Sequence, residues 1–198
     1  MEDNIIELKQ GEVLLHTNDE IKCLYLILSG ETDIYSRYGR ISTSAGSILG
    51  LSGSLYGLSL YNYVAKSDCT LRKFTVSGIS DLEKILREYP DMVPDIVILN
   101  EHFIMELIKL YLSMMIKCKR KDPSFTPDSR LNKWVLDKHN GIASIPEDIK
   151  KAYFGANISN SAGIIIENTE FINLLHELVE DIIPGQLLDG LAVDAQNG

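Results

Sequence analysis

Serine and glycine residues are concentrated between positions 42 and 59, where hydroxyls and backbone N–H groups are the main groups able to bind a ligand. The stretch contains Gly46, Gly50, Gly53 and Gly57 among Ser42, Ser44, Ser47, Ser52, Ser54 and Ser59. Successive backbone N–H groups in such a loop form a concavity that can hold an anion or a neutral ligand. The alternative is a loop that turns the chain and binds nothing, and the sequence leaves both possibilities open.

Charged side chains are missing from the same part of the chain. No Asp or Glu occurs from Ile34 to Ser67, and no Lys or Arg occurs between Ile41 and Ala65.

The histidines and cysteines are too scattered to indicate a metal site or a nucleophilic triad. The four histidines (His16, His102, His139, His176) form no HxH or HExxH pattern, and the three cysteines (Cys23, Cys69, Cys118) form no CxxC pair. Widely spaced cysteines in odd number favour reduced thiols in the cytoplasm. We therefore expect no metal, no cofactor and no catalytic residue, and we predict that the protein is not an enzyme.

The net charge of −9 is unevenly distributed along the chain. Residues 1–151 hold all 19 Lys and Arg against 21 Asp and Glu, a charge of −2, whereas residues 152–198 hold 7 acidic residues and no basic one, a charge of −7. Nucleic-acid-binding surfaces are basic, so this distribution argues against a general nucleic-acid binder. No secretory signal is recognisable at the acidic start Met1–Asn4, and Ile96–Ile116 contains charges too costly for a bilayer. These features predict a cytoplasmic protein that does not bind membranes.

Short apolar runs separated by turn signals predict antiparallel β structure over residues 1–78. The runs recur about every 8–12 residues, a spacing typical of a sandwich or jelly roll. They are Ile5-Ile6, Val13–Leu15, Leu24–Leu28, Asp33–Tyr35, Tyr63–Ala65 and Leu71–Val76.

The remainder of the chain is predicted to be helical. Ser80 and Glu83 form a capping box for a helix Ser80–Tyr89, and a long helix Pro94–Cys118 follows because proline suits a first helical turn. After a linker at 122–128, we expect short helices at Ser129–Lys138, Pro146–Phe154 and Thr169–Ile183, the last with Thr169 as its cap. The predicted class is α+β, with an N-terminal antiparallel β-roll, a long helix and a small α-helical C-terminal part. The predicted domains are 1–118, the roll with its helices, and 119–198, a linker and an acidic helical region.

Apolar residues of the predicted long helix form a wide stripe. One row contains Ile96, Leu99, Phe103, Leu107, Leu110 and Met114, and a second row contains Ile104, Ile108, Tyr111 and Met115. A stripe this wide is more than one packing partner needs. We therefore predict that one side covers the roll and that the first row is the seam of a homodimer. Burial of both rows within one chain, under the C-terminal segment, is the alternative.

Five segments of the β region follow an order known from one family. They read LKQGEV at 8–13, LYLILSGE at 24–31, IY at 34–35, AGSILG at 45–50 and VAKSDCTL at 64–71. In this order they resemble the cyclic nucleotide-binding domain of catabolite-activator-type regulators and kinase regulatory subunits, and the two helices after the roll extend the resemblance over residues 5–118. The resemblance implies a ligand cassette between two late strands. In that cassette, backbone N–H groups and one Arg take the cyclic phosphate, and one Glu takes the ribose hydroxyl.

The chain departs from this family at the ligand-binding groups. Gly50 matches the cassette glycine, but Leu51 stands at the Glu position and Ser59 lies near the Arg position. Leaving a buried charged group without its partner costs about 2–5 kcal/mol, so binding of cAMP or cGMP is predicted to be weak or absent. The residues of this degenerate cassette are Gly46, Gly50, Leu51, Ser52, Ser59 and Leu60.

These patterns predict a non-enzymatic regulatory or sensor module that acts through dimerisation or through docking of a partner protein. Two alternatives remain. One is a catabolite-activator-type transcription regulator with an atypical DNA-binding domain, although DNA binding is disfavoured by the acidic C-terminal helices. The other is a ligand-free scaffold domain of a larger complex.

Overall fold

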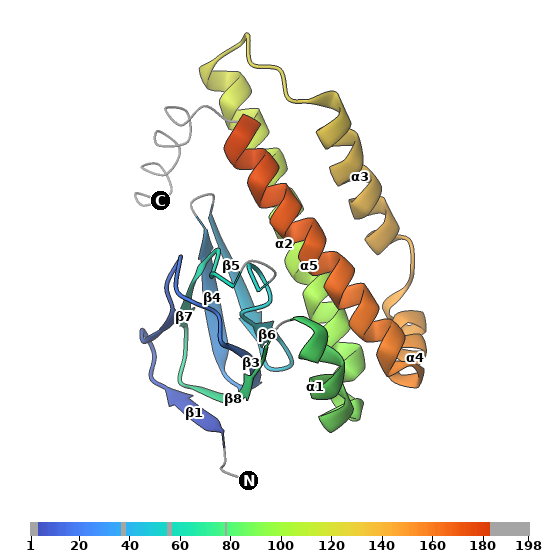
Figure 1. The fold of residues 1–198 in the computed structure, drawn as a ribbon. Helices are drawn as coiled ribbons and strands as arrows, with labels where there is room; N and C mark the ends of the chain where they lie inside the picture. The colour runs from blue at the N-terminus through green and yellow to red at the C-terminus, as the bar shows by residue number, and fades with distance from the viewer. Residues whose placement is uncertain (1–3, 37–38, 55–56, 78, 183–198) are drawn as a thin grey trace.

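The N-terminal part of the chain forms a roll of two antiparallel four-stranded sheets, as the sequence predicted (Figure 1). The computed structural model describes residues 4–36, 39–54, 57–77 and 79–182. One sheet has the order β1-β8-β3-β6 and the other β2-β7-β4-β5. The strands are β1 Ile5–Leu8, β2 Val13–Leu15, β3 Cys23–Ser29, β4 Glu31–Ser36, β5 Gly39–Ser44, β6 Ile48–Leu49, β7 Asn62–Ala65 and β8 Cys69–Thr75.

Two of these strands, β5 and β6, were not among the predicted runs. In β5 the sequence GRISTS has a single large apolar residue, Ile41, so apolar alternation is too weak to detect. The strand forms because each of its six residues pairs with β4, from Glu31↔Ser44 to Ser36↔Gly39. Strand β6 has two residues and pairs with Tyr25 and Leu26 of β3.

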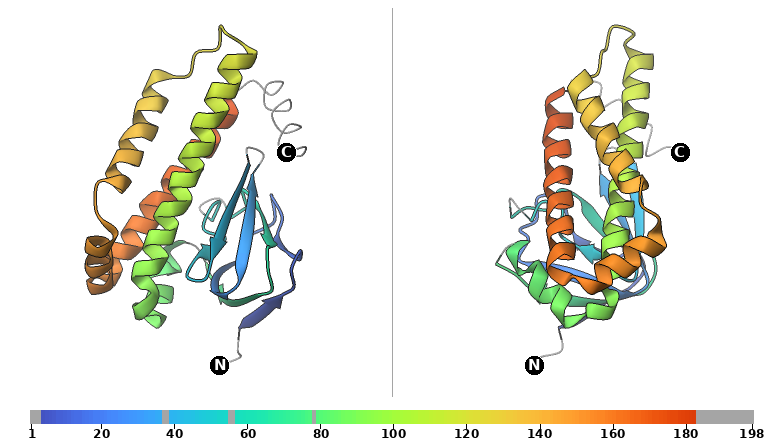
Figure 2. Two further views of the ribbon diagram at one scale, coloured as in Figure 1. Left: turned by 180° about the vertical axis from the view of Figure 1, so that it is seen from behind. Right: turned by 90° about the vertical axis from the view of Figure 1, so that its right-hand side faces the viewer.

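The helices lie together on one side of the roll (Figures 1 and 2). Helix α2 packs against both α5 and the roll, and α3 lies on the side away from the roll (Figure 2). They are α1 Leu82–Glu88, α2 Val93–Lys121, α3 Ser129–Ala143, α4 Glu147–Ala156 and α5 Ile158–Ile182, with 3₁₀ turns at Ile79–Asp81 and Pro90–Met92. The long helix is therefore where the sequence predicted it, whereas α3 continues past its predicted end at Lys138.

The predicted start of the last helix at Thr169 is wrong. Helix α5 begins at Ile158, directly after Asn157, whose Oδ1 accepts a hydrogen bond of 3.0 Å from the N–H of Asn160. Thr169 is buried in the middle of α5, and its hydroxyl donates to the carbonyl of Ile165 at 2.8 Å. A polar residue that bonds to the preceding turn of its own helix does not need to be at the helix end.

The predicted capping box of the first helix is also wrong. Ser80 lies inside the 3₁₀ turn that precedes α1. The carboxylate of Asp81 instead accepts hydrogen bonds from the N–H and hydroxyl of Ser77, at 2.9 and 2.8 Å. Glu83 accepts a hydrogen bond of 2.8 Å from the hydroxyl of Ser159, so it ties α1 to α5 rather than capping its own helix.

Apolar side chains from both predicted domains pack together in two core clusters. One cluster joins the inside of the roll to α2, α3 and α5, with Leu71, Ile108 and Ile172 among its buried members. A second cluster joins β3 to α1, α2 and α5 through residues such as Leu24 and Leu86. The predicted division at residue 118 stays a prediction, and the structure has apolar contacts across it.

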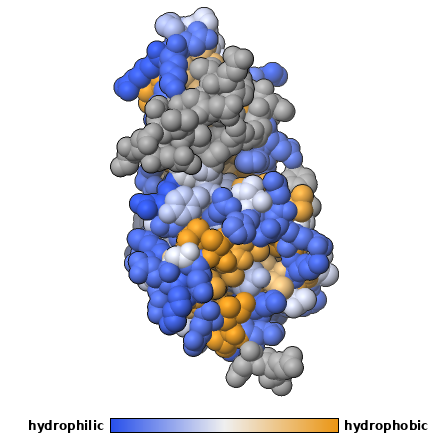
Figure 3. All heavy atoms as spheres, turned by 90° about the vertical axis from the view of Figure 1, so that its left-hand side faces the viewer, coloured by the Kyte–Doolittle hydropathy of each residue, from blue (hydrophilic) through white to orange (hydrophobic). Residues whose placement is uncertain are grey.

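The surface adds two observations. On the face of the roll turned away from the helices, apolar side chains gather in a patch with hydrophilic side chains around it (Figure 3). Within the described residues, no helix combines the length and the hydropathy that crossing a bilayer requires.

Candidate functional site

The predicted cassette residues lie where the roll meets the helices, but they do not form one site. Leu51 and Ser52 line a small cavity against α2 and α5, and Gly46 lies beside Leu99 of α2. Ser59 instead pairs with the loop before β3, through hydrogen bonds between its backbone and those of Asn18 and Asp19. The other two are not among the residues that line the cavity: Gly50 follows β6, and Leu60 lies beside Gly53.

The cassette cavity, as we name this space, is far too small for a nucleotide. Its volume is about 30 Å³, whereas small-molecule sites usually have about 300–1,000 Å³ and a water fills about 30 Å³ of the liquid. No Asp, Glu, Lys or Arg is among the described residues that line it. They are Ile34, Thr43, Ser47, Ile48, Leu49, Leu51, Ser52, Tyr63, Ile96, Leu99, Asn100, Phe103 and Ile172.

Tyr63 is the one titratable group among the described residues that line this cavity. Its place in an apolar strand pattern hid this role in the sequence. Burial raises the pKa of Tyr63 to about 12, although hydrogen bonds with Ser52 and the Gly50 backbone act in the opposite direction. The phenol is therefore neutral at physiological pH, and the cavity carries no charge of its own.

Helix α5 contacts the Ser/Gly loop at residues 42–59 through a hydrogen bond that the sequence did not indicate. The N–H of Gly53 donates to Oδ1 of Asn173 at 3.0 Å, and both residues are buried, Asn173 with 1% of its surface exposed. The Nδ2 of the same side chain donates to the carbonyl of Thr169 at 2.7 Å, which fixes its orientation. The N–H of Gly53 is thus satisfied by an amide oxygen of the same chain.

Two glycines of this loop lie where a side chain would not fit: Gly53 within the loop itself, and Gly46 against helix α2. Gly53 has φ = +88°, and a Cβ there would lie 1.9 Å from the carbonyl oxygen of Leu58. Gly46 has φ = +94°, and its Cβ would lie 3.0 Å from Cδ1 of Leu99 on α2. Both positions combine a backbone conformation that favours glycine with too little space for a side chain.

The predicted dimer seam on α2 is covered mainly by the same chain. Ile96, Leu107 and Met114 are buried, whereas Leu99, Phe103 and Leu110 are partly buried. Helix α5 and the roll supply most of the covering side chains, which is the arrangement that the alternative to a dimer required. Homodimerisation stays a prediction, and a seam built from these residues would have to displace contacts within the chain.

Comparison with known proteins agrees with the geometry of the roll. Residues 5–86 match the family model described as cyclic nucleotide-binding domain. The segment from β1 into α1 therefore has the cyclic nucleotide-binding fold, while most of the helical part lies outside the match. A search of curated protein sequences finds no significant match.

Several solved structures are also similar to part of the chain. A regulatory subunit of a cAMP-independent protein kinase A from Trypanosoma brucei is 24% identical, with a TM-score of 0.34 over 36% of this chain and 27% of that one. A cyclic nucleotide-binding-like protein from Brucella abortus is 22% identical, with a TM-score of 0.31 over 36% of this chain and 66% of that one. The N-terminal domain of a transcriptional regulator from Streptomyces coelicolor is 20% identical, with a TM-score of 0.32 over 44% and 64%.

The contact between Asn173 and Gly53 gives a first prediction. An Asn173→Leu variant is expected to lower the free energy of unfolding by about 1–3 kcal/mol, because a buried N–H is left without an acceptor. Urea denaturation measures the change, and hydrogen exchange at the Gly53 amide should become faster. The matched control is Asn140→Leu, an exposed position on α3. Equal stability of the two variants would show that the contact contributes nothing.

Proposed function

We propose that this protein is a non-enzymatic regulatory module in which helix α5, instead of a cyclic nucleotide, closes the cassette of the roll. Its output would then pass through docking of a partner protein. The observation that carries the proposal is the hydrogen bond from the Gly53 N–H to Asn173 over a cavity of about 30 Å³. A loop N–H that already has a buried acceptor is not available to a phosphate.

The charge distribution supports the same conclusion independently of α5. Between Ile41 and Ala65 the sequence has no charged residue, so no shift in register supplies the Arg or the Glu that the family uses. A loss of about 2–5 kcal/mol corresponds to roughly 30- to 4,000-fold in affinity. Micromolar binding of a cyclic nucleotide would fall towards the millimolar range.

The competing interpretation as a DNA-binding regulator has less support. Lys150 is buried, and three other basic residues near α3 and α4 are already ion-paired. The pairs are Lys133–Asp137, Lys138–Glu167 and Lys151–Asp95. A surface that binds DNA needs basic side chains free to contact phosphates.

Calorimetry with cAMP and with cGMP tests the proposal on the full chain. We expect no binding with a dissociation constant below about 10 μM. The Asn173→Leu variant is measured alongside, because it frees the Gly53 N–H without restoring the missing charges. This variant should also fail to bind cAMP or cGMP. Tight binding by the unmodified chain would refute the proposal, and tight binding by the variant alone would mean that α5, rather than the lost charges, excludes the nucleotide.

A further inference from the structure

A second cavity lies within the helical part of the molecule, away from the cassette. We call it the helical cavity. Helices α3, α4 and α5 and the loop at 144–146 form its walls, and Glu101 of α2 lies at its floor. Its volume is about 570 Å³, which falls inside the range of about 300–1,000 Å³ found for small-molecule sites. The cassette cavity is smaller by more than tenfold.

Exposed apolar side chains are concentrated at this cavity. Ile145, Ile149 and Tyr153 are 49%, 57% and 55% exposed, and all three line it. Ile142 and Ile164 add apolar surface from the facing helices. Large apolar side chains gathered around a concavity are a feature of ligand-binding grooves.

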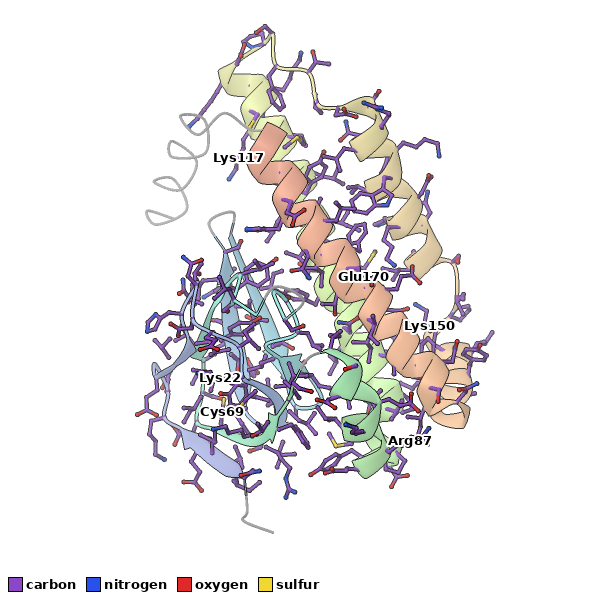
Figure 4. All side chains as sticks on the ribbon, viewed as in Figure 1. Lys22, Cys69, Arg87, Lys117, Lys150 and Glu170 are labelled. Atoms are coloured by element: carbon purple, nitrogen blue, oxygen red, sulfur yellow. The ribbon has the colours of Figure 1, made fainter. Side chains whose placement is uncertain are left out.

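Two charged side chains at the floor of the helical cavity are buried, and one of them keeps a hydrogen without an acceptor in the described part of the chain. Lys150, labelled in Figure 4 beside α4, donates to Oε2 of Glu101 at 2.6 Å and to the carbonyl of Ile142 at 2.7 Å. An ammonium group has three hydrogens, so one has no acceptor among the described residues. Lys150 and Glu101 are only 6% and 8% exposed. The remaining hydrogen offers a ligand a directed contact in a site whose accessible surface is largely apolar.

The charges around the helical cavity are already balanced by ion pairs. Lys150 pairs with Glu101, Lys138 pairs with Glu167 at 3.1 Å, and Asp137 pairs with a lysine one turn earlier on α3. A charged ligand would bring an uncompensated charge into an apolar site or break one of these pairs, and both are costly. The fitting occupant is therefore uncharged.

We propose that the helical cavity binds an uncharged, largely apolar small molecule that carries an oxygen acceptor, such as a carbonyl or hydroxyl, for Lys150. The apolar body would cover Ile145, Ile149 and Tyr153, and the oxygen would take the remaining hydrogen of the ammonium. This site lies outside the cassette, so it does not depend on whether the cassette binds a nucleotide.

Binding of Nile red to the full chain tests the site directly. This dye is uncharged, carries a ring carbonyl and fluoresces strongly in apolar surroundings. We expect saturable binding, displacement by 1-decanol, and at least tenfold weaker displacement by decanoate at pH 8. Absence of saturable binding would refute the proposal. Equal displacement by decanoate would refute the uncharged class of ligand.

Two helical glycines supply a matched pair of variants. A Cβ added at Gly141 or at Gly163 meets nothing within 4 Å, but Gly141 lines the helical cavity and Gly163 does not. Gly141→Leu is expected to fill the mouth of the cavity and weaken dye binding at least tenfold. Gly163→Leu should leave binding unchanged. Because leucine favours a helix over glycine, neither variant is expected to unfold.

The mass of the dye-bound protein separates a small-molecule site from an interface between copies. Sedimentation should give the same mass with and without dye. Dye binding that survives Gly141→Leu, or that requires a doubled mass, would place the dye elsewhere and overturn the proposal.

Discussion

A Leu107→Asp variant is expected to lose more than about 3 kcal/mol of unfolding free energy, rather than convert a dimer into a stable monomer. Leu107 is 7% exposed and belongs to the core cluster that joins α2 to the roll and α5. The change removes apolar contacts and leaves a carboxylate beside apolar neighbours such as Met114 and Leu175. Urea denaturation followed by circular dichroism measures the loss.

The control for this variant is Ile116→Asp, on the same helix. Ile116 is an exposed apolar residue, so its substitution is expected to change stability by no more than about 0.5 kcal/mol. Light scattering on the unmodified chain and on both variants then tests the predicted dimer seam. Full stability of Leu107→Asp together with a halved mass would support the seam and contradict the burial of Leu107 within the chain.

The strands of the roll were largely predictable because their patterns are local. Runs such as Leu24–Leu28 are continuously apolar and end at turn residues, whereas the pairing of β1 and β3 with β8 joins distant parts of the chain. Strand β5 was not predictable, because Ile41 alone marks its buried face and the pairing with β4 supplies the rest. Apolar alternation in a sequence reflects burial, so a strand with one buried large side chain has no recognisable alternation.

The extent of helix α5 was missed because its buried face contains polar residues. Ser161, Thr169 and Asn173 each donate to a carbonyl of the preceding turn, so they are satisfied inside the helix. From sequence, such residues suggest a loop or a cap. Asn157, a favoured N-cap residue, was the signal available for the true start.

At the predicted cassette, the sequence shows where charged residues are absent, but it did not indicate the contact with α5. The absence of charged residues between Ile41 and Ala65 holds in any register. The closing contact joins Gly53 to Asn173, residues 120 positions apart. Local patterns carry no information about such a pairing, and an asparagine in a helix has many ordinary roles.

A Lys150→Met variant is expected to lower the free energy of unfolding by about 3–5 kcal/mol. The substitution leaves the carboxylate of Glu101 buried without its partner at 2.6 Å, and the carbonyl of Ile142 loses its donor as well. Urea denaturation measures the loss. The matched control is Lys109→Met on α2, because Lys109 pairs with Glu106 on the exposed surface and exposed pairs contribute little.

The double variant Glu101→Leu/Lys150→Met shows whether the loss comes from the unpaired charge. When both charges are replaced by apolar residues, most of the stability should return, because no buried ion remains to be compensated. If Lys150→Met lowers the free energy of unfolding no more than Lys109→Met does, the Glu101–Lys150 pair is solvated. Water would then reach the floor of the helical cavity. If the double variant is as unstable as Lys150→Met, packing of the lysine stem, rather than its charge, holds α4 against α2.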